Sequence, residues 1–282
     1  MNRSKWLVRL VAVANCRARV FAFPFSGGSA HSYAHWRNWW TGDMELWAIE
    51  APGRAARIAK SPISTLDEIV RQLVPDMMPL LDRPYILFGH SNGALMAFAI
   101  ANRLLELGAP APEGIILSGR CSPSRDKRRE RVSTLPDNEF LCRLRSFEGT
   151  PKELLNNPEV MRLFFPAMRA DFATGETYTL SKIHAALSDV PALVLAGTHD
   201  STGVAEIFAW TEIFPSARTR LLEGGHFFIN TDFSFPAIFQ EFCSASLKLS
   251  SPTPSAINAV ASECGIGDLQ QCKLPTTYKP NP

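Results

Sequence analysis

The sequence lacks a long apolar run, a strong net charge and paired cysteines. No stretch approaches the roughly 18 consecutive apolar residues that a membrane-spanning helix needs. The formal net charge of +2 gives no overall attraction to nucleic acid or to a strongly acidic partner. Six cysteines without C-x-x-C or Cys/His spacing argue against the common zinc motifs and against a disulfide-stapled scaffold. We therefore expect a cytoplasmic protein with reduced cysteines that binds no metal, membrane or nucleic acid.

The N-terminus contains the one candidate targeting signal. Arg3 and Lys5 precede an apolar stretch at residues 6–13, as basic residues do in secretory signal peptides. Arg9 interrupts that stretch, however, and residues 12–14 (AVA) form only a weak cleavage site. We expect that the protein is not secreted.

Apolar residues are abundant, at 46% of the chain, and they occur as short runs followed by turn residues. Runs that are apolar almost throughout are typical of parallel strands covered by helices on both faces. Six such runs lie at residues 19–25, 44–52, 85–90, 114–119, 191–197 and 219–225, and helical spacing lies between them at 65–80, 92–107 and 204–214. The alternation predicts an α/β fold with a mostly parallel central sheet flanked by helices, and with ligands at the carboxyl ends of the strands.

One interval, between residues 119 and 191, is too long for a simple crossover. Residues 137–147 and 158–172 within it have apolar residues at helical spacing. We predict a helical insertion over about residues 121–188, which either adds packing helices or, as we favour, forms a lid over the substrate pocket. The tail at residues 245–282 is rich in Pro, Ser and Thr, so we expect a folded domain at residues 1–244 and a linker-like or disordered tail.

The pentapeptide GHSNG at residues 89–93 fits the G-x-S-x-G pattern of a nucleophile elbow. A predicted strand precedes it and a helical pattern follows it. This context places Ser91 at a sharp turn where flanking side chains would clash, which explains the two glycines. A purely structural turn is the alternative, but the strand-turn-helix setting favours Ser91 as a nucleophile.

A serine hydroxyl needs a general base that a carboxylate orients. Asp200 in GTHD and His226 in GGHFF each follow a predicted strand, at the sheet edge where Ser91 also emerges, and their order along the chain is that of α/β-hydrolases. His199 would point away from its neighbour Asp200 on an extended segment. Other candidates are less well placed. His31 and His35 lie before the serine, His90 is the variable position of the elbow, and His184 lies in the insertion. Asp189 precedes its strand, and Asp232 is expected in a turn.

Backbone amides are expected to bind the oxyanion of a tetrahedral intermediate. One is the N–H of Asn92, directly after the nucleophile. The other should come from the loop FPFSGG at residues 23–28, whose glycines let the backbone approach a substrate closely. A simple glycine turn is the alternative for this loop.

Beyond these residues, the sequence resembles the type II (external) thioesterases of polyketide and nonribosomal peptide synthesis. The resemblance extends from Trp6 to about residue 242, and its motifs inside the insertion make it more specific than a Ser-Asp-His set alone. The motifs are FPFSGG (23–28), APGR (51–54), GHSNGA (89–94), LPDNEFL (135–141), GTPKELL (149–155), MRADFATGETY (168–178), GTHD (197–200) and GGHFF (224–228).

This resemblance implies a single α/β-hydrolase domain with a helical lid. It implies a serine thioesterase that hydrolyses acyl groups from the phosphopantetheine arm of acyl or peptidyl carrier proteins, with no cofactor of its own because the substrate carries the pantetheine. Ser91 matches the nucleophile of the family, Asp200 its acid and His226 its base, and Ser26 and Asn92 match the oxyanion-hole positions. We expect a monomer.

Other functions remain open at this point. A dedicated hydrolase that releases medium-chain acyl groups from a carrier protein is the main alternative, and a general carboxylesterase is a weaker one. A non-catalytic module that binds carrier proteins is a third possibility, although such a module has no need to keep Ser91, Asp200 and His226 together.

The sequence departs from the family pattern in two residues near the predicted site. Asn92 replaces the usual methionine, which should make the pocket wall more polar, and Ser26 replaces a common alanine. The apolar residues expected to contact the acyl group are Phe25, Phe140, Leu144, Phe164 and Phe165. The basic run SRDKRRER at residues 124–131 either docks an acidic carrier protein or is simply a solvated face.

Overall fold

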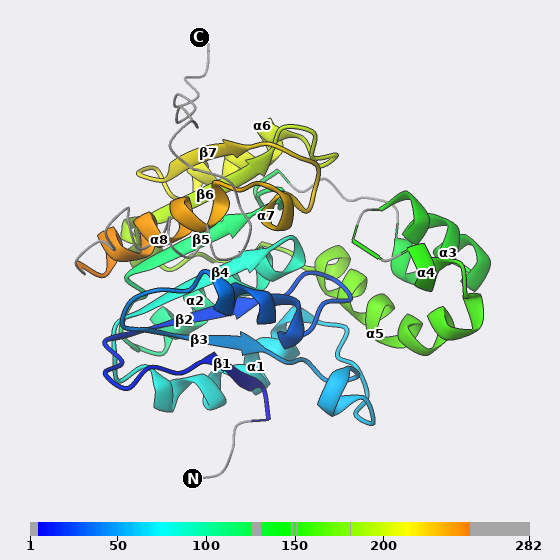
Figure 1. Cartoon of the computed structure of the whole chain (residues 1–282), viewed down its shortest axis with the longest axis horizontal. Helices are drawn as coiled ribbons and strands as arrows, with labels where there is room; N and C mark the ends of the chain where they lie inside the picture. Colours follow the sequence, from blue (N-terminus) through cyan, green and yellow to red (C-terminus); the bar gives the residue numbers. More distant parts are fainter. Residues whose placement is uncertain (1–4, 126–130, 148, 151, 181, 249–282) are drawn as a thin grey trace.

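The computed structural model describes residues 5–125, 131–147, 149–150, 152–180 and 182–248. In this part of the chain a seven-stranded sheet forms the centre of the molecule (Figure 1). Its strands lie in the order β1 (Leu7–Val11), β3 (Met44–Ile49), β2 (Ala18–Phe23), β4 (Tyr85–His90), β5 (Gly114–Ser118), β6 (Ala192–Gly197) and β7 (Arg218–Leu222). All neighbouring strands are parallel except β1, which pairs antiparallel with β3. The predicted fold class is confirmed.

Strand β1 was not among the predicted strands. It lies at the edge of the sheet, where a strand has only one neighbour and needs fewer apolar residues. Leu7 is buried, whereas the residues after it are half-buried or exposed. Arg9, which interrupts the apolar stretch in the sequence, reaches across to Glu45 on β3, with Nη1 2.9 Å from Oε1. The charged residue that weakened the strand pattern is therefore accommodated by an ion pair at the sheet edge.

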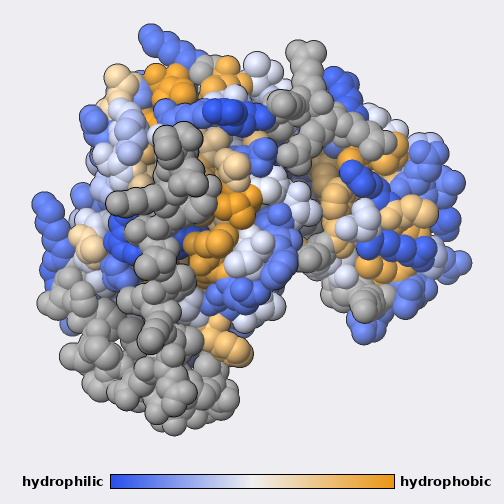
Figure 2. Space-filling model, turned by 90° about the horizontal axis from the view of Figure 1, so that it is seen from above, coloured by the Kyte–Doolittle hydropathy of each residue, from blue (hydrophilic) through white to orange (hydrophobic). Residues whose placement is uncertain are grey.

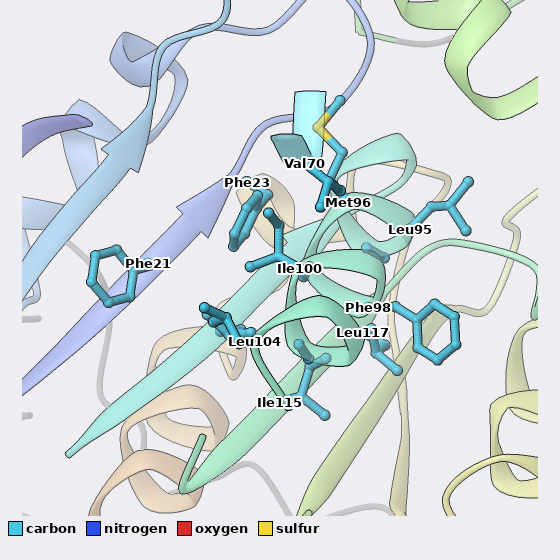
Figure 3. Close-up of a cluster of buried hydrophobic side chains, with 14 of the residues drawn as sticks. Phe21, Phe23, Val70, Leu95, Met96, Phe98, Ile100, Leu104, Ile115 and Leu117 are labelled. Carbon is cyan, nitrogen blue, oxygen red and sulfur yellow. The ribbon is translucent and has the colours of Figure 1, made fainter. Parts of the chain in front are cut away.

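Helices cover both faces of the sheet because successive residues of a buried strand point to opposite sides. Phe21 and Phe23 of β2 pack against α1 (Leu66–Met77) and α2 (Asn92–Glu106), and Figure 3 shows this cluster with Leu95, Met96 and Ile100 of α2 among its members. Val20 and Ala22 of β2 belong instead to the layer formed by the 3-10 helix η1 (Ala30–Asn38), α7 (Phe228–Thr231) and α8 (Phe235–Ser246). These two layers hold the carboxyl ends of the strands in place.

The interval between β5 and β6 contains helices, as the sequence predicts. These are η4 (Val132–Thr134), α3 (Asp137–Ser146), α4 (Lys152–Leu155), α5 (Pro158–Thr177) and η5 (Ala185–Asp189). The first four form a small apolar core of their own and lie to one side of the sheet (Figure 1). Whether this insertion acts as a lid stays a prediction.

The remaining helical segments connect the strands. They are η2 (Ala55–Arg57), η3 (Met78–Leu80), α6 (Val204–Phe208) and η6 (Ala209–Glu212). Helix α8 continues to Ser246, two residues past the predicted domain end, and most of the predicted tail, residues 249–282, lies outside the described residues. In the described part of the chain, no helix combines the length and the apolarity needed to cross a membrane.

Candidate active site

Ser91 occupies a strained turn between the end of β4 and the start of α2. Its backbone angles are φ 54° and ψ −123°, in a region that residues with a Cβ rarely adopt. A Cβ on Gly89 would lie 2.1 Å from the carbonyl oxygen of Gly93, and a Cβ on Gly93 would lie 2.0 Å from the carbonyl oxygen of Phe23. Only glycine fits at either position, so the G-x-S-x-G pattern follows from the close approach of strand, turn and helix.

Asp200 and His226 are hydrogen-bonded at the same edge of the sheet. His226 Nδ1 lies 3.1 Å from Oδ1 and 3.0 Å from Oδ2 of Asp200. Thr202 N–H also donates to Asp200 Oδ1, at 2.9 Å. Burial alone would raise the pKa of Asp200, but the hydrogen bond and the charge of His226 outweigh burial and hold that pKa below its usual value. The carboxylate is therefore ionised at neutral pH and can orient the imidazole.

The ring of His226 lies beside the ring of His90, the residue before Ser91 in the elbow. The two ring centroids are 5.0 Å apart. A Cβ on Gly119, just after β5, would lie only 2.7 Å from Cε1 of His90, so glycine leaves room for the His90 ring. His90 is itself fixed by Ser118, whose Oγ lies 2.9 Å from its Nδ1. The structure thus brings the predicted base and acid beside the turn that carries the predicted nucleophile.

The loop before η1 is a β-turn from Phe25 to Gly28. The N–H of Gly28 donates to the carbonyl of Phe25 at 2.9 Å, and Gly27 has φ +78°, the value that calls for glycine at the third position of a type II turn. Ser26 is the second residue of this turn, and its amide makes no hydrogen bond to any residue that the structure describes. Asn92 is the first residue of α2, where a backbone N–H has no partner within the helix. Both amides therefore lack a partner within the turn or helix, and their binding of an oxyanion stays a prediction.

The Asn92 side chain binds helix α5. It is buried, and its Nδ2 donates to the carbonyl oxygen of Asp171 at 3.0 Å and to Oγ1 of Thr174 at 2.8 Å. The departure from methionine at this position therefore fastens α2 to the insertion, beyond the added polarity that the sequence alone suggested.

Residues 18–247, most of the chain, match the family model described as Thioesterase domain. The chain belongs to this thioesterase family. Thioesterase PikA5 of Streptomyces venezuelae is 32% identical over 228 residues, which are 80% of this chain and 80% of that protein. A protein of Brevibacillus parabrevis named Linear gramicidin dehydrogenase LgrE is 32% identical over 236 residues, which are 82% of this chain and 89% of that protein.

Solved structures agree with this membership. The type II thioesterase BorB from the borrelidin biosynthetic cluster superposes with a TM-score of 0.77 at 28% identity, covering 86% of this chain and 99% of that chain. These likenesses confirm the resemblance to type II thioesterases that the sequence motifs indicated, together with the α/β-hydrolase fold. The protein is a thioester hydrolase by family.

The competing histidines and acids of this thioesterase lie elsewhere or have other partners. His199 is exposed and its Nδ1 lies 3.5 Å from Oε1 of Glu223. Asp232 accepts from the N–H of Glu223 at 2.6 Å and from that of Ser234 at 2.7 Å, which is the turn role expected for it. Asp189 ends η5, before β6 begins. Within the described residues, no group of three or more His, Cys, Asp or Glu side chains is placed to hold a metal ion.

The predicted acyl-contacting residues divide into three groups. Phe140, Leu144 and Phe165 are buried within the insertion's own core. Phe164 on α5 is 41% exposed, and Phe25 packs edge-on against Phe227, beside the predicted base, with ring centroids 4.8 Å apart. Figure 2 shows apolar side chains on the insertion, the lobe at the right. Contact of these five residues with an acyl chain stays a prediction.

Sequence reasoning assigned no role to two buried charged residues of the site, Arg54 and Asp171. Their guanidinium and carboxylate groups form two hydrogen bonds of 2.7 Å across a separation of 117 residues. Both residues lie inside motifs that carried the family resemblance, APGR and MRADFATGETY. Asp171 could have been identified from the sequence, because it is a charged residue within the apolar helical pattern of α5.

His90 should make the stability of the thioesterase depend on pH. Burial, together with the charge of the neighbouring His226, holds the pKa of His90 well below its usual 6.5. Below pH 6.5 the unfolded chain therefore binds a proton that the folded chain does not, so the free energy of unfolding falls as the pH drops. We expect the loss between pH 6.5 and 5 to be about 1.5 kcal/mol smaller in His90→Gln, measured by urea unfolding. His31→Gln, at an exposed histidine, controls for the substitution, and an unchanged pH profile in His90→Gln would contradict the assignment.

Proposed function

We propose that this thioesterase hydrolyses acyl groups from the phosphopantetheine arm of carrier proteins, through an acyl-enzyme formed on Ser91. The observation that carries the proposal is the hydrogen bond between His226 and the buried Asp200, beside the strained turn of Ser91, in a chain of the thioesterase family. This is the arrangement that a serine nucleophile needs.

In the proposed mechanism, Asp200 accepts the hydrogen bond of His226 Nδ1–H, which leaves Nε2 as the proton acceptor. His226 takes the hydroxyl proton as Ser91 Oγ attacks the thioester carbonyl carbon. The N–H groups of Ser26 and Asn92 hold the negative oxygen of the tetrahedral intermediate. The carbon–sulfur bond then breaks, the pantetheine thiolate takes the proton from His226, and the acyl group stays on Ser91.

The second half repeats these steps with water. His226 removes a proton from the water as it attacks the acyl-enzyme, and the same two amides hold the oxyanion. Collapse of the intermediate returns the proton to Ser91 and releases the carboxylic acid. The reaction takes no metal or cofactor from the enzyme, and its partners are acyl or peptidyl carrier proteins of a biosynthetic synthase in the cytoplasm. The relatives support such partners, since they include the type II thioesterase BorB from a biosynthetic cluster.

The basic run at residues 124–131 has a smaller role in this proposal. Arg125 is held by Glu212, with Nε 2.8 Å from Oε1, so its charge is already paired. Residues 126–130 lie outside the described residues. Docking of an acidic carrier surface on this run stays a prediction.

The test is to incubate the purified protein with carrier proteins loaded with acetyl, malonyl, octanoyl, palmitoyl and aminoacyl groups, and to follow unloading by intact mass. We expect the wild-type protein to release several of these groups and Ser91→Ala to release none above the buffer rate. Release of the octanoyl group alone would favour the chain-releasing hydrolase. Binding of carriers without any release would favour the non-catalytic module and overturn the proposal.

A further inference from the structure

We propose that Asp171, clamped by Arg54, is a positioning residue that holds the oxyanion hole in shape and couples it to helix α5 of the insertion. The inference rests on the proposed function, since it concerns the amides assigned there to the oxyanion. It adds two residues, Arg54 and Asp171, to the predicted set of Ser91, Asp200 and His226. It also gives the insertion a way to influence the chemical step.

Asp171 contacts the predicted oxyanion loop directly. Its carboxylate is buried, and Oδ2 accepts the backbone N–H of Gly27 at 2.8 Å. Gly27 follows Ser26, so this hydrogen bond fixes the peptide plane next to the Ser26 amide. The bond joins α5 to the turn between β2 and η1, 144 residues apart in the sequence.

Arg54 holds the carboxylate and the turn together. Its Nη1 and Nη2 lie 2.7 Å from Oδ2 and Oδ1 of Asp171, the two-pronged geometry in which arginine binds carboxylates most specifically. Nη1 also donates to the carbonyl oxygen of Gly28 at 2.8 Å. The turn is thus held at the Gly27 N–H and at the Gly28 carbonyl. A buried ion pair contributes little to net stability, so precise placement of the turn is the better explanation for this one.

The other oxyanion donor is tied to the same turn of α5. Asn92 Nδ2 donates to the carbonyl oxygen of Asp171 and to Oγ1 of Thr174, and the Thr174 hydroxyl donates to the Asp171 carbonyl at 2.7 Å. One helical turn, residues 171–174, therefore holds the residue that carries the Asn92 amide and the turn that carries the Ser26 amide. In Figure 1, α5 runs from the outlying insertion back to the sheet, so its position sets both sides of the oxyanion hole.

The consequence is a specific kinetic signature. Loosening Asp171 should displace an oxyanion donor, which stabilises the transition state more than the bound substrate. We expect Asp171→Asn and Arg54→Gln each to lower kcat about 100-fold while KM changes less than about threefold. The double variant Arg54→Gln/Asp171→Asn should be no slower than either single variant, because the two residues act as one unit.

A second buried arginine–carboxylate pair provides a matched control. Arg19 Nε lies 3.2 Å from Oε2 of Glu45, near the amino ends of β2 and β3 and therefore at the opposite end of the sheet. Arg19→Gln and Glu45→Gln also break a buried pair. If Asp171 has a purely structural role, the variants of both ion pairs should lose similar stability and keep the wild-type kcat. If it has the positioning role, only the variants of Arg54 and Asp171 should lower kcat.

The deciding measurement compares two inhibitors in all variants. An alkyl trifluoromethyl ketone forms a tetrahedral adduct on Ser91 and places its oxygen in the oxyanion hole. An unreactive thioether analogue of acyl pantetheine, with the same alkyl chain, only occupies the pocket. Asp171→Asn should weaken the ketone about 100-fold and the thioether less than threefold. Equal effects on both, or no effect on the ketone, would overturn the inference.

A second variant decides the question if Asp171→Asn does not fold. Asn92→Ala keeps the backbone amide and removes only the bonds to α5, and we expect it to weaken the ketone about tenfold without changing the thioether. Unchanged affinity for the ketone would then overturn the coupling to α5. Absence of hydrolysis by the wild-type protein would instead overturn the proposed function, so the two failures are distinguishable.

Discussion

Alanine in place of Ser91 is expected to lower kcat for acyl carrier protein hydrolysis by about 10⁶-fold, with little change in KM. The reason is that the proposed mechanism forms the acyl-enzyme on this single hydroxyl, and no other serine stands on the elbow between β4 and α2. A steady-state assay of thiol release, with the acyl carrier as substrate, gives both parameters. Intact mass after rapid quenching should also show an acyl adduct on the wild-type protein and none on the variant.

The same assay tests whether Ser91 and His226 act together. His226→Ala should be nearly as slow as Ser91→Ala, and the double variant no slower than either, because residues of a working triad are strongly non-additive. Ser122→Ala is the matched control, since Ser122 is a buried serine beyond β5 that hydrogen-bonds Ser124 Oγ at 2.9 Å. If Ser91→Ala kept more than a hundredth of the wild-type rate, another nucleophile would have to be sought.

Alanine in place of Gly93 is expected to destabilise the protein by about 4 kcal/mol or more, or to prevent its folding. The added Cβ would lie 2.0 Å from the carbonyl oxygen of Phe23. That oxygen belongs to the backbone of β2, so the clash cannot be relieved by moving a side chain. The start of α2 would have to move away from the end of β2, which also separates the elbow from the predicted oxyanion loop. Urea unfolding followed by circular dichroism measures the loss.

Gly42→Ala provides the comparison for Gly93→Ala. Gly42 has φ +85° and no atom within 4 Å of an added Cβ, so alanine there meets only backbone strain. We expect a cost of about 1 kcal/mol at this position. Equal losses in the two variants would contradict the close packing of strand and helix at the elbow. Soluble Gly42→Ala beside insoluble Gly93→Ala would agree with it.

Much of the fold could be predicted because the central strands are apolar on both faces and end in turn residues. The predicted run at 85–90 coincides with β4, and that at 191–197 includes all of β6. The edge strand β1 escaped prediction, since its outer residues need not be apolar and the charge of Arg9 within it is paired by Glu45 from another strand. The predicted domain end at residue 244 falls two residues short of the end of α8, at Ser246.

The sequence by itself determined the positions of Ser91, Asp200 and His226, because each follows a recognisable strand and parallel strands bring their carboxyl ends to one edge. It also contained both glycines of the elbow, but only the structure shows that the second one, Gly93, is required by the carbonyl oxygen of Phe23 on β2. Only the tertiary structure decided that Asp171, with Arg54, joins the predicted oxyanion loop to α5, and that Asn92 joins α2 to α5. Those contacts depend on how an inserted helix packs against the sheet edge, and no periodicity within any one segment encodes that packing.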